Sequence, residues 1–79
     1  MNNERRERIE AVITNLEEIM DELSLIQEEE QAAYDNLPEG LQESQRGMDI
    51  EECAEQLQES VDELDTMIDN LRSEVLDVY

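Results

Sequence analysis

Histidine, lysine, phenylalanine and tryptophan are missing from this sequence of 79 residues, and cysteine occurs once, as Cys53. A single cysteine cannot form a disulfide within the chain, and without histidine the usual zinc ligand sets cannot be assembled. A chain of this length buries only about 60% of its unfolded surface, so it usually needs a disulfide, a metal or oligomerisation for support. Of these three kinds of support only oligomerisation is left, and we therefore expect a dimer or a larger homo-oligomer.

Basic residues are also scarce: 24 acidic residues face five arginines, for a net charge of -19. Residues 1–8 carry three arginines and two glutamates, so the remaining residues carry 22 acids against two arginines, a net charge of -20. Phosphate binding needs a basic face, which excludes direct binding to nucleic acid or to an anionic membrane. A basic partner is favoured, because the field of the chain would steer it.

Long apolar runs are missing as well. Nothing approaches the roughly 20 consecutive apolar residues of a membrane span, and no apolar run follows the charged N-terminus as a secretory signal would. A lone cysteine without such a signal is typical of a reducing compartment. We therefore expect a cytoplasmic protein.

Apolar residues fall at helical spacing over residues 9–37. With Ile9 at heptad position a, they occupy a (Ile9, Leu16, Leu23, Leu37), d (Val12, Ile19, Ile26, Ala33) and e (Ile13, Met20, Tyr34). A stripe of this width is typical of a bundle helix rather than of a two-stranded coiled coil. Glu30 interrupts the a positions, and we interpret it as a soft spot near the helix end or as a group that faces a partner.

A second stripe alternates steps of four and three residues without a break. Its members are Ile50, Ala54, Leu57, Val61, Leu64, Ile68, Leu71, Val75 and Val78. The flanking positions offer almost no opposite charges that could fix a parallel homodimer. Cys53 and Met67 widen the apolar face towards a second neighbour, so this stripe also favours a bundle.

The segment between the stripes holds the only proline, Pro38, and both glycines, Gly40 and Gly47. Pro38 disfavours helix at the residue before it, and Asp49 with Glu52 resembles a capping box. We predict one all-α domain over residues 1–79: a first helix at about 4–35, a loop at 36–48 that folds back over the core, with a short helical turn near 38–44 as one option, and a second helix at about 49–77.

Two helices of nearly equal length joined by a compact loop form an antiparallel two-helix hairpin. A lone hairpin would leave half of each wide stripe exposed, so we predict that hairpins self-associate, with a dimeric four-helix bundle as the expected assembly. The residues assigned to the core or to the oligomer interface are Ile9, Leu16, Ile19, Leu23, Ile26, Leu57, Val61, Leu64, Ile68, Leu71 and Val75.

The loop resembles a segment of small acidic helical proteins encoded by bacteriophages and prophages. The resemblance rests on Tyr34, on the sequence DNLPEGLQ at residues 35–42, and on Arg46-Gly47, whereas Gln45 departs from the usual glutamate. It covers about fifteen residues and extends to the helices only in composition. The resemblance implies a virus-related origin and a bacterial host cell as the setting, and it supplies no catalytic residue.

Catalytic and metal-binding motifs are missing: we find no phosphate-binding glycine loop, no nucleophile–base pair, no Glu-x-x-His and no EF-hand pattern. We predict a non-enzymatic protein without cofactor or metal. The abundant carboxylates lie mostly off the apolar stripes, where solvated faces are the simplest interpretation. Cys53 is best interpreted as a small buried hydrophobe, and Tyr34 as a cap on the core whose hydroxyl could also reach a partner.

Carboxylates repeated along a long helix can also imitate the phosphates of a nucleic acid, with spacings of about 6 to 10 Å. The sequence thus leaves two hypotheses: an inhibitor of a basic nucleic-acid-binding host protein, such as a defence factor, or a homo-oligomeric structural or accessory protein whose charge only maintains solubility. In a homo-oligomer, we expect glutamates of a neighbouring chain to pair with Arg5, Arg6 and Arg8. The candidate partner-binding residues are Glu17, Glu18, Asp21, Glu22, Glu28, Glu29, Glu55, Glu59, Asp62, Glu63 and Asp69.

Overall fold

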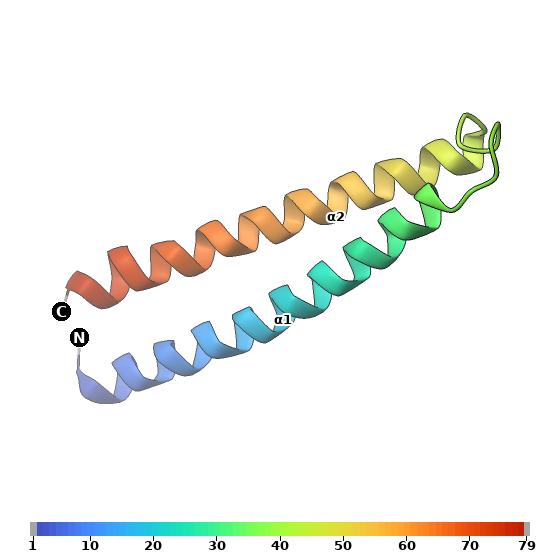
Figure 1. Ribbon diagram of the computed structural model, residues 1–79. Coiled ribbons are helices and arrows are strands. Elements are labelled where there is room, and N and C mark those ends of the chain that lie inside the picture. Colours follow the sequence, from blue (N-terminus) through green and yellow to red (C-terminus); the bar gives the residue numbers. More distant parts are fainter. Residues whose placement is uncertain (1, 79) are drawn as a thin grey trace.

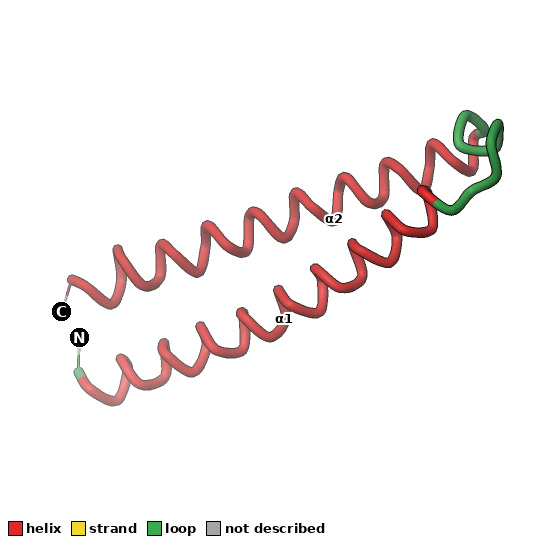
Figure 2. The backbone as a smooth tube through the Cα atoms, viewed as in Figure 1, coloured by secondary structure: helices red, strands yellow, loops and turns green. Residues whose placement is uncertain are grey.

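The computed structural model describes residues 2–78 as two long helices packed side by side in a hairpin (Figure 1). Helix α1 (Asn3–Asp35) is followed by α2 (Gln45–Asn70), by a π-helical turn η1 (Leu71–Val75) and by a 3-10 turn η2 (Leu76–Val78). The helices run antiparallel, and Figure 2 shows the connecting loop at one end with both chain ends at the other. The Cα atoms span 58 × 16 × 12 Å, so the molecule is a thin rod. These features confirm the all-α hairpin.

Helix α1 matches the predicted range of 4–35 to within a residue. The side chain of Asn2 caps its start and accepts a hydrogen bond from the Arg5 amide at 2.9 Å. The helix ends at Asp35, where the Asn36 amide still donates to the Ala32 carbonyl at 2.9 Å. The chain then enters the loop before Pro38, as the steric restriction on the residue preceding proline requires.

Helix α2 begins at Gln45, four residues before the predicted start at 49. Ser44 is the cap: its hydroxyl accepts from the Gly47 amide at 3.2 Å and donates to the Leu41 carbonyl. Asp49 therefore lies inside the helix, where its carboxylate accepts from the Gln45 side chain at 2.8 Å. The prediction was wrong because two cap-like residues stand five positions apart, and the folded-back loop favours the earlier one.

The loop turns back through two successive backbone hydrogen bonds. The Leu41 amide donates to the Pro38 carbonyl at 3.0 Å, and the Ser44 amide donates to the Leu41 carbonyl at 3.1 Å. Gly40 adopts a φ of +89°, in the left-handed region that favours glycine. Gly47 is buried, and a Cβ there would overlap the carbonyl oxygens of Leu41 and Gln42.

The hydrophobic core lies at the open end of the hairpin, away from the loop. Ile13, Ile68 and Leu76 are buried together, and these partly buried residues pack around them: Ile9, Leu16, Met20 and Leu71. Burying an aliphatic side chain of this size contributes about 1.5–3 kcal/mol. Beyond this cluster, Ala54 is the one further buried apolar residue among residues 2–78.

The contact of α1 with α2 does not use the two heptad rows, a and d, that supplied the predicted core residues of α1. In α1 the half-buried and buried apolar positions are the a row and the e row, including Ile9, Ile13 and Leu16, rather than a and d. The d row faces outwards: 51% of Ile19 and 39% of Ile26 are exposed. Both residues were assigned to the core or to an oligomer interface, and within the hairpin they are not core.

The C-terminal turn differs from the predicted continuous helix. A π-helical turn has more residues per turn than an α-helix, so η1 rotates the following residues relative to the stripe. Leu76 is buried in consequence, whereas 67% of Val78 is exposed and Val75 is only half-buried. The regular spacing of the sequence had predicted Val75 and Val78 as stripe residues and had omitted Leu76.

Candidate protein-binding surfaces

The candidate acidic residues are almost all exposed. Ten of the eleven are exposed, and Glu17 is half-buried because it forms an ion pair with Arg72 across the two helices at 2.6 Å. The pair joins α1 to the turn η1 that follows α2, and it therefore marks one broad face of the hairpin. A shallow pocket lined by Glu10, Glu17 and Arg72 opens on the same face.

About half of the candidate residues gather on this face. Helical periodicity relative to the buried stripe places them there in two antiparallel rows, which we name the acidic face: Glu17, Asp21 and Glu28 on α1, and Glu55, Asp62 and Asp69 on α2. Carboxylates seven residues apart are about 10.5 Å apart along a helix. The acidic face is thus a regular array of negative charge along the rod.

The other candidate residues do not belong to this array. Glu18 and Glu59 project from the outer edges of the helices, away from the interface. Glu22, Glu29 and Glu63 lie on the opposite side of the hairpin from the acidic face. The sequence identified the exposed acids, but it did not divide them between faces, because that division depends on which heptad rows pack.

The side opposite the acidic face carries an apolar row beside the acids Glu22, Glu29 and Glu63, and sequence reasoning did not separate this row from the core. This apolar face consists of the outward row of α1, continued on α2 by residues at matching positions: Val12, Ile19, Ile26, Ala33, Cys53 and Met67. About half of each of Val12, Ile19 and Met67 is exposed. Cys53 is exposed, which contradicts its interpretation as a buried hydrophobe.

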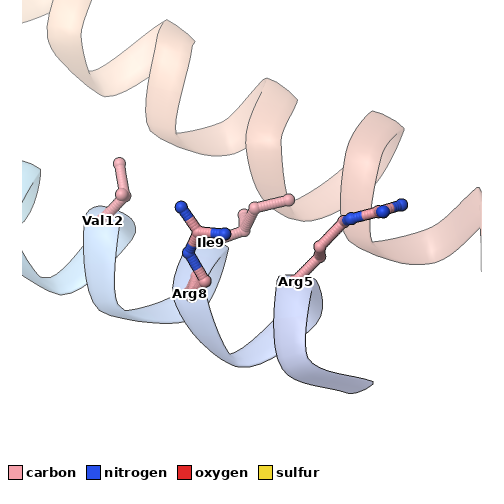
Figure 3. A pocket seen from close by; sticks show the side chains of 4 residues that line it. All are labelled: Arg5, Arg8, Ile9 and Val12. Atoms are coloured by element: carbon pink, nitrogen blue, oxygen red, sulfur yellow. The ribbon is translucent and has the colours of Figure 1, made fainter. Parts of the chain in front are cut away.

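Arginines border the apolar face at the open end of the hairpin. Arg5, Arg8, Ile9 and Val12 line a surface pocket of about 300 Å³ (Figure 3). Within residues 2–78, the guanidinium groups of Arg5 and Arg8 make no hydrogen bond or ion pair. Arg6 differs, because it donates to the Leu76 carbonyl at 2.6 Å and approaches Glu10 at 3.9 Å. Both contacts tie Arg6 to its own chain.

Tyr34 joins the two helices beside the loop. The Glu51 carboxylate on α2 lies near enough to act as a hydrogen-bond acceptor for the Tyr34 hydroxyl, and this effect, with desolvation and nearby acids, raises the pKa of Tyr34 above its usual value. The Tyr34 carbonyl accepts from the Gln42 side chain and from the Leu37 amide, both at 3.1 Å.

Metal-binding and membrane-spanning features are absent from residues 2–78. No group of three or more acidic or cysteine side chains in this part of the chain is arranged to hold a metal ion. No helix within it combines the length and apolarity needed to cross a membrane. Comparison with protein-family models, with curated proteins and with solved structures found no match to the chain.

Proposed function

We propose that this protein is a non-catalytic binding protein of the phage or prophage type that inhibits a basic nucleic-acid-binding protein of the host. Its acidic face would occupy the basic groove that otherwise holds nucleic acid. The host setting rests on the resemblance of the loop at residues 35–47, and the bacterial cytoplasm is the matching location. The partner is a protein with a basic groove, such as a nuclease or another defence factor.

The observation that carries this proposal is the regular array of carboxylates on the acidic face. Glu55, Asp62 and Asp69 follow one another along α2 at intervals of about 10.5 Å, and Asp21 and Glu28 run beside them on α1. A helical rod holds these charges at fixed positions, so a groove can engage several of them without ordering a flexible chain. Arg72 is bound to Glu17 and lies near one end of the array.

A charge-neutralised variant tests this proposal against net charge alone. The face variant combines Glu55→Gln, Asp62→Asn and Asp69→Asn, and the matched edge variant combines Glu18→Gln, Glu52→Gln and Glu59→Gln. Each removes three negative charges from exposed positions. The unmodified protein serves as bait in bacterial lysate at low salt, with a salt gradient for elution and DNA as a competitor.

The expected result is one basic nucleic-acid-binding protein, displaced by added DNA and inhibited by the bait. The face variant should weaken that binding at least about tenfold more than the edge variant, because only it disrupts the array. Equal losses for the two variants would show that net charge alone attracts the partner. Capture that DNA does not displace would contradict nucleic-acid mimicry.

The exposed apolar face favours a second candidate function, a homo-oligomeric structural or accessory protein. In this proposal hairpins pair into a four-helix bundle, and the acidic residues only maintain solubility. The two candidates respond to salt in opposite directions. Salt weakens the contact between an acidic face and a basic groove, whereas it strengthens apolar self-association by screening the repulsion between chains that each carry a charge of -19.

A further inference from the structure

One side of the hairpin has apolar side chains and unpaired cations next to each other. On α1, Val12, Ile19 and Ile26 recur at intervals of seven residues, with 49%, 51% and 39% of each residue exposed. Arg5 and Arg8 flank Val12 at the open end, and their guanidinium groups make no ion pair within residues 2–78. This arrangement indicates a surface that is completed by something outside the hairpin.

The loop end is far more acidic than the open end. Among residues 28–55, which form the loop and the helix segments beside it, Arg46 is the only basic residue and ten acidic residues surround it. The open end instead holds four arginines, namely Arg5, Arg6, Arg8 and Arg72. The hairpin is therefore charge-asymmetric along its length, and two copies repel each other least when the arginines at the open end of one lie beside the loop end of the other.

We propose that a second copy of this chain covers the apolar face, with the two hairpins antiparallel and their loops at opposite ends of the assembly. The inference rests on the four-helix bundle proposed above and specifies its contact face and direction. A two-fold axis passes near residues 22–23 of α1. Ile19 then lies opposite Ile26 of the second copy, and Val12 opposite Ala33.

The alternative direction, with both loops at the same end, sets the acidic loop ends of the two copies side by side. It would set α1 of one copy against α2 of the other, with Val12 near Glu74 and Ile26 near Ser60, but also Ile19 near Met67, so the charge distribution and not the apolar pattern favours the antiparallel direction. The antiparallel arrangement instead buries the row of α1 against the same row of the second copy. It also brings Arg5 and Arg8 towards the acidic loop end of that copy.

The broad side of the hairpin that carries the apolar face is large enough for a stable dimer. The Cα extents of 58 × 16 Å give that whole side an area of roughly 900 Å², and a specific protein interface buries about 800 Å² on each partner. The acidic face lies on the other side of each hairpin and stays outside, so the dimer does not bring the two charge arrays into contact. The same arrangement leaves each array available to a basic partner.

Sedimentation of matched variants tests the contact face. The variant Ile19→Gln with Ile26→Gln removes four isoleucines from each dimer, and Leu25→Gln is the control, because Leu25 is 49% exposed but points away from the face. We expect the unmodified chain to dimerise, the double variant to raise the dimer Kd at least about a hundredfold, and the control to change it little. Circular dichroism should show unchanged helicity, since all three residues are exposed in the hairpin.

Disulfide formation tests the direction in a Cys53→Ser background. With loops at opposite ends, Glu22→Cys places two cysteines beside the two-fold axis, within reach of a disulfide, whereas Asn15→Cys separates them by roughly 20 Å. We expect oxidation to cross-link the first variant and not the second. If both loops lay at the same end, neither the Glu22→Cys variant nor the Asn15→Cys variant would form the disulfide preferentially.

The possible failures differ from one another. An unmodified chain that stays monomeric at high concentration and high salt would overturn the bundle and this inference together. A dimer that survives the isoleucine double variant would leave the bundle standing and overturn the contact face. A dimer whose Glu22→Cys variant does not cross-link, or whose Asn15→Cys variant does, would overturn the direction alone.

Discussion

The two ends of the hairpin are held together in different ways. At the open end, Ile13, Ile68 and Leu76 form an apolar cluster. At the loop end, α1 brings half-buried Gln27 and Glu30 to the interface, and the contact depends on hydrogen bonds and on the close approach of the loop to Gly47. The comparison shows that an acidic chain with few core residues can concentrate its hydrophobic burial at one end. At the other end, hydrogen bonds and close packing of the loop backbone on Gly47 hold the helices together.

Replacing Ile68 by alanine should have the largest effect, because it opens a cavity in the apolar cluster. Only 1% of Ile68 is exposed, and an isoleucine-to-alanine change at such a site costs about 3 kcal/mol. Urea unfolding followed by circular dichroism, at one fixed protein concentration, measures the loss. Leu25→Ala is the control and should stay within about 0.5 kcal/mol of the unmodified chain, since Leu25 is half exposed. Similar losses for both variants would contradict a core at the open end.

Replacing Gly47 by alanine should be the next most costly change, and it acts at the loop end. The added Cβ would overlap backbone carbonyl oxygens, which cannot move aside as a flexible side chain can, so we expect a loss of about 2 kcal/mol. Gly40→Ala is the matched control: its Cβ would point into open space, and only the positive φ costs about 1 kcal/mol. A Gly47→Ala variant as stable as the unmodified chain would show that the loop does not pack against α2.

The smallest expected effect concerns the Tyr34–Glu51 hydrogen bond. Because the folded chain raises the pKa of Tyr34, the bond contributes stability below the unfolded pKa of about 10 and loses it as the pH rises through the higher folded pKa. Tyrosinate absorbance in a Tyr79→Phe background reports Tyr34 alone. Glu51→Gln should lower the pKa of Tyr34 towards its usual value, and an unchanged titration would show that Glu51 is not its partner.

Much of the fold could be predicted from the sequence because helical periodicity is a strong signal. The spacing from Ile9 to Tyr34, together with Pro38, was sufficient to predict α1 and its end. The start of α2 was not predictable in the same way, because Ser44 and Asp49 are both acceptable caps and the choice depends on how the loop packs on Gly47. The inward turn of Leu76 was missed because the π-helical turn changes the period itself.

The candidate surfaces could be predicted only as a set of exposed acids. Three apolar rows on α1 exceed what one neighbouring helix can cover, and the sequence alone does not indicate which two rows α2 takes. Helix α2 packs on the rows of Ile9 and Ile13 and leaves the row of Ile19 exposed. This packing decides which side of the hairpin is the acidic face and which is the apolar face. It depends on the geometry of two helices in contact, which no local pattern records.

The thinness of the rod has a consequence for how such a sequence can change over generations. Of residues 2–78, only Ile13, Gly47, Ala54, Ile68 and Leu76 are buried. Substitutions at the other positions meet little packing resistance, provided that helix formation and the sign of the charge are kept. Lineages that preserve this shape and charge can therefore drift apart in residue identity, and related proteins will be recognised by pattern more readily than by alignment.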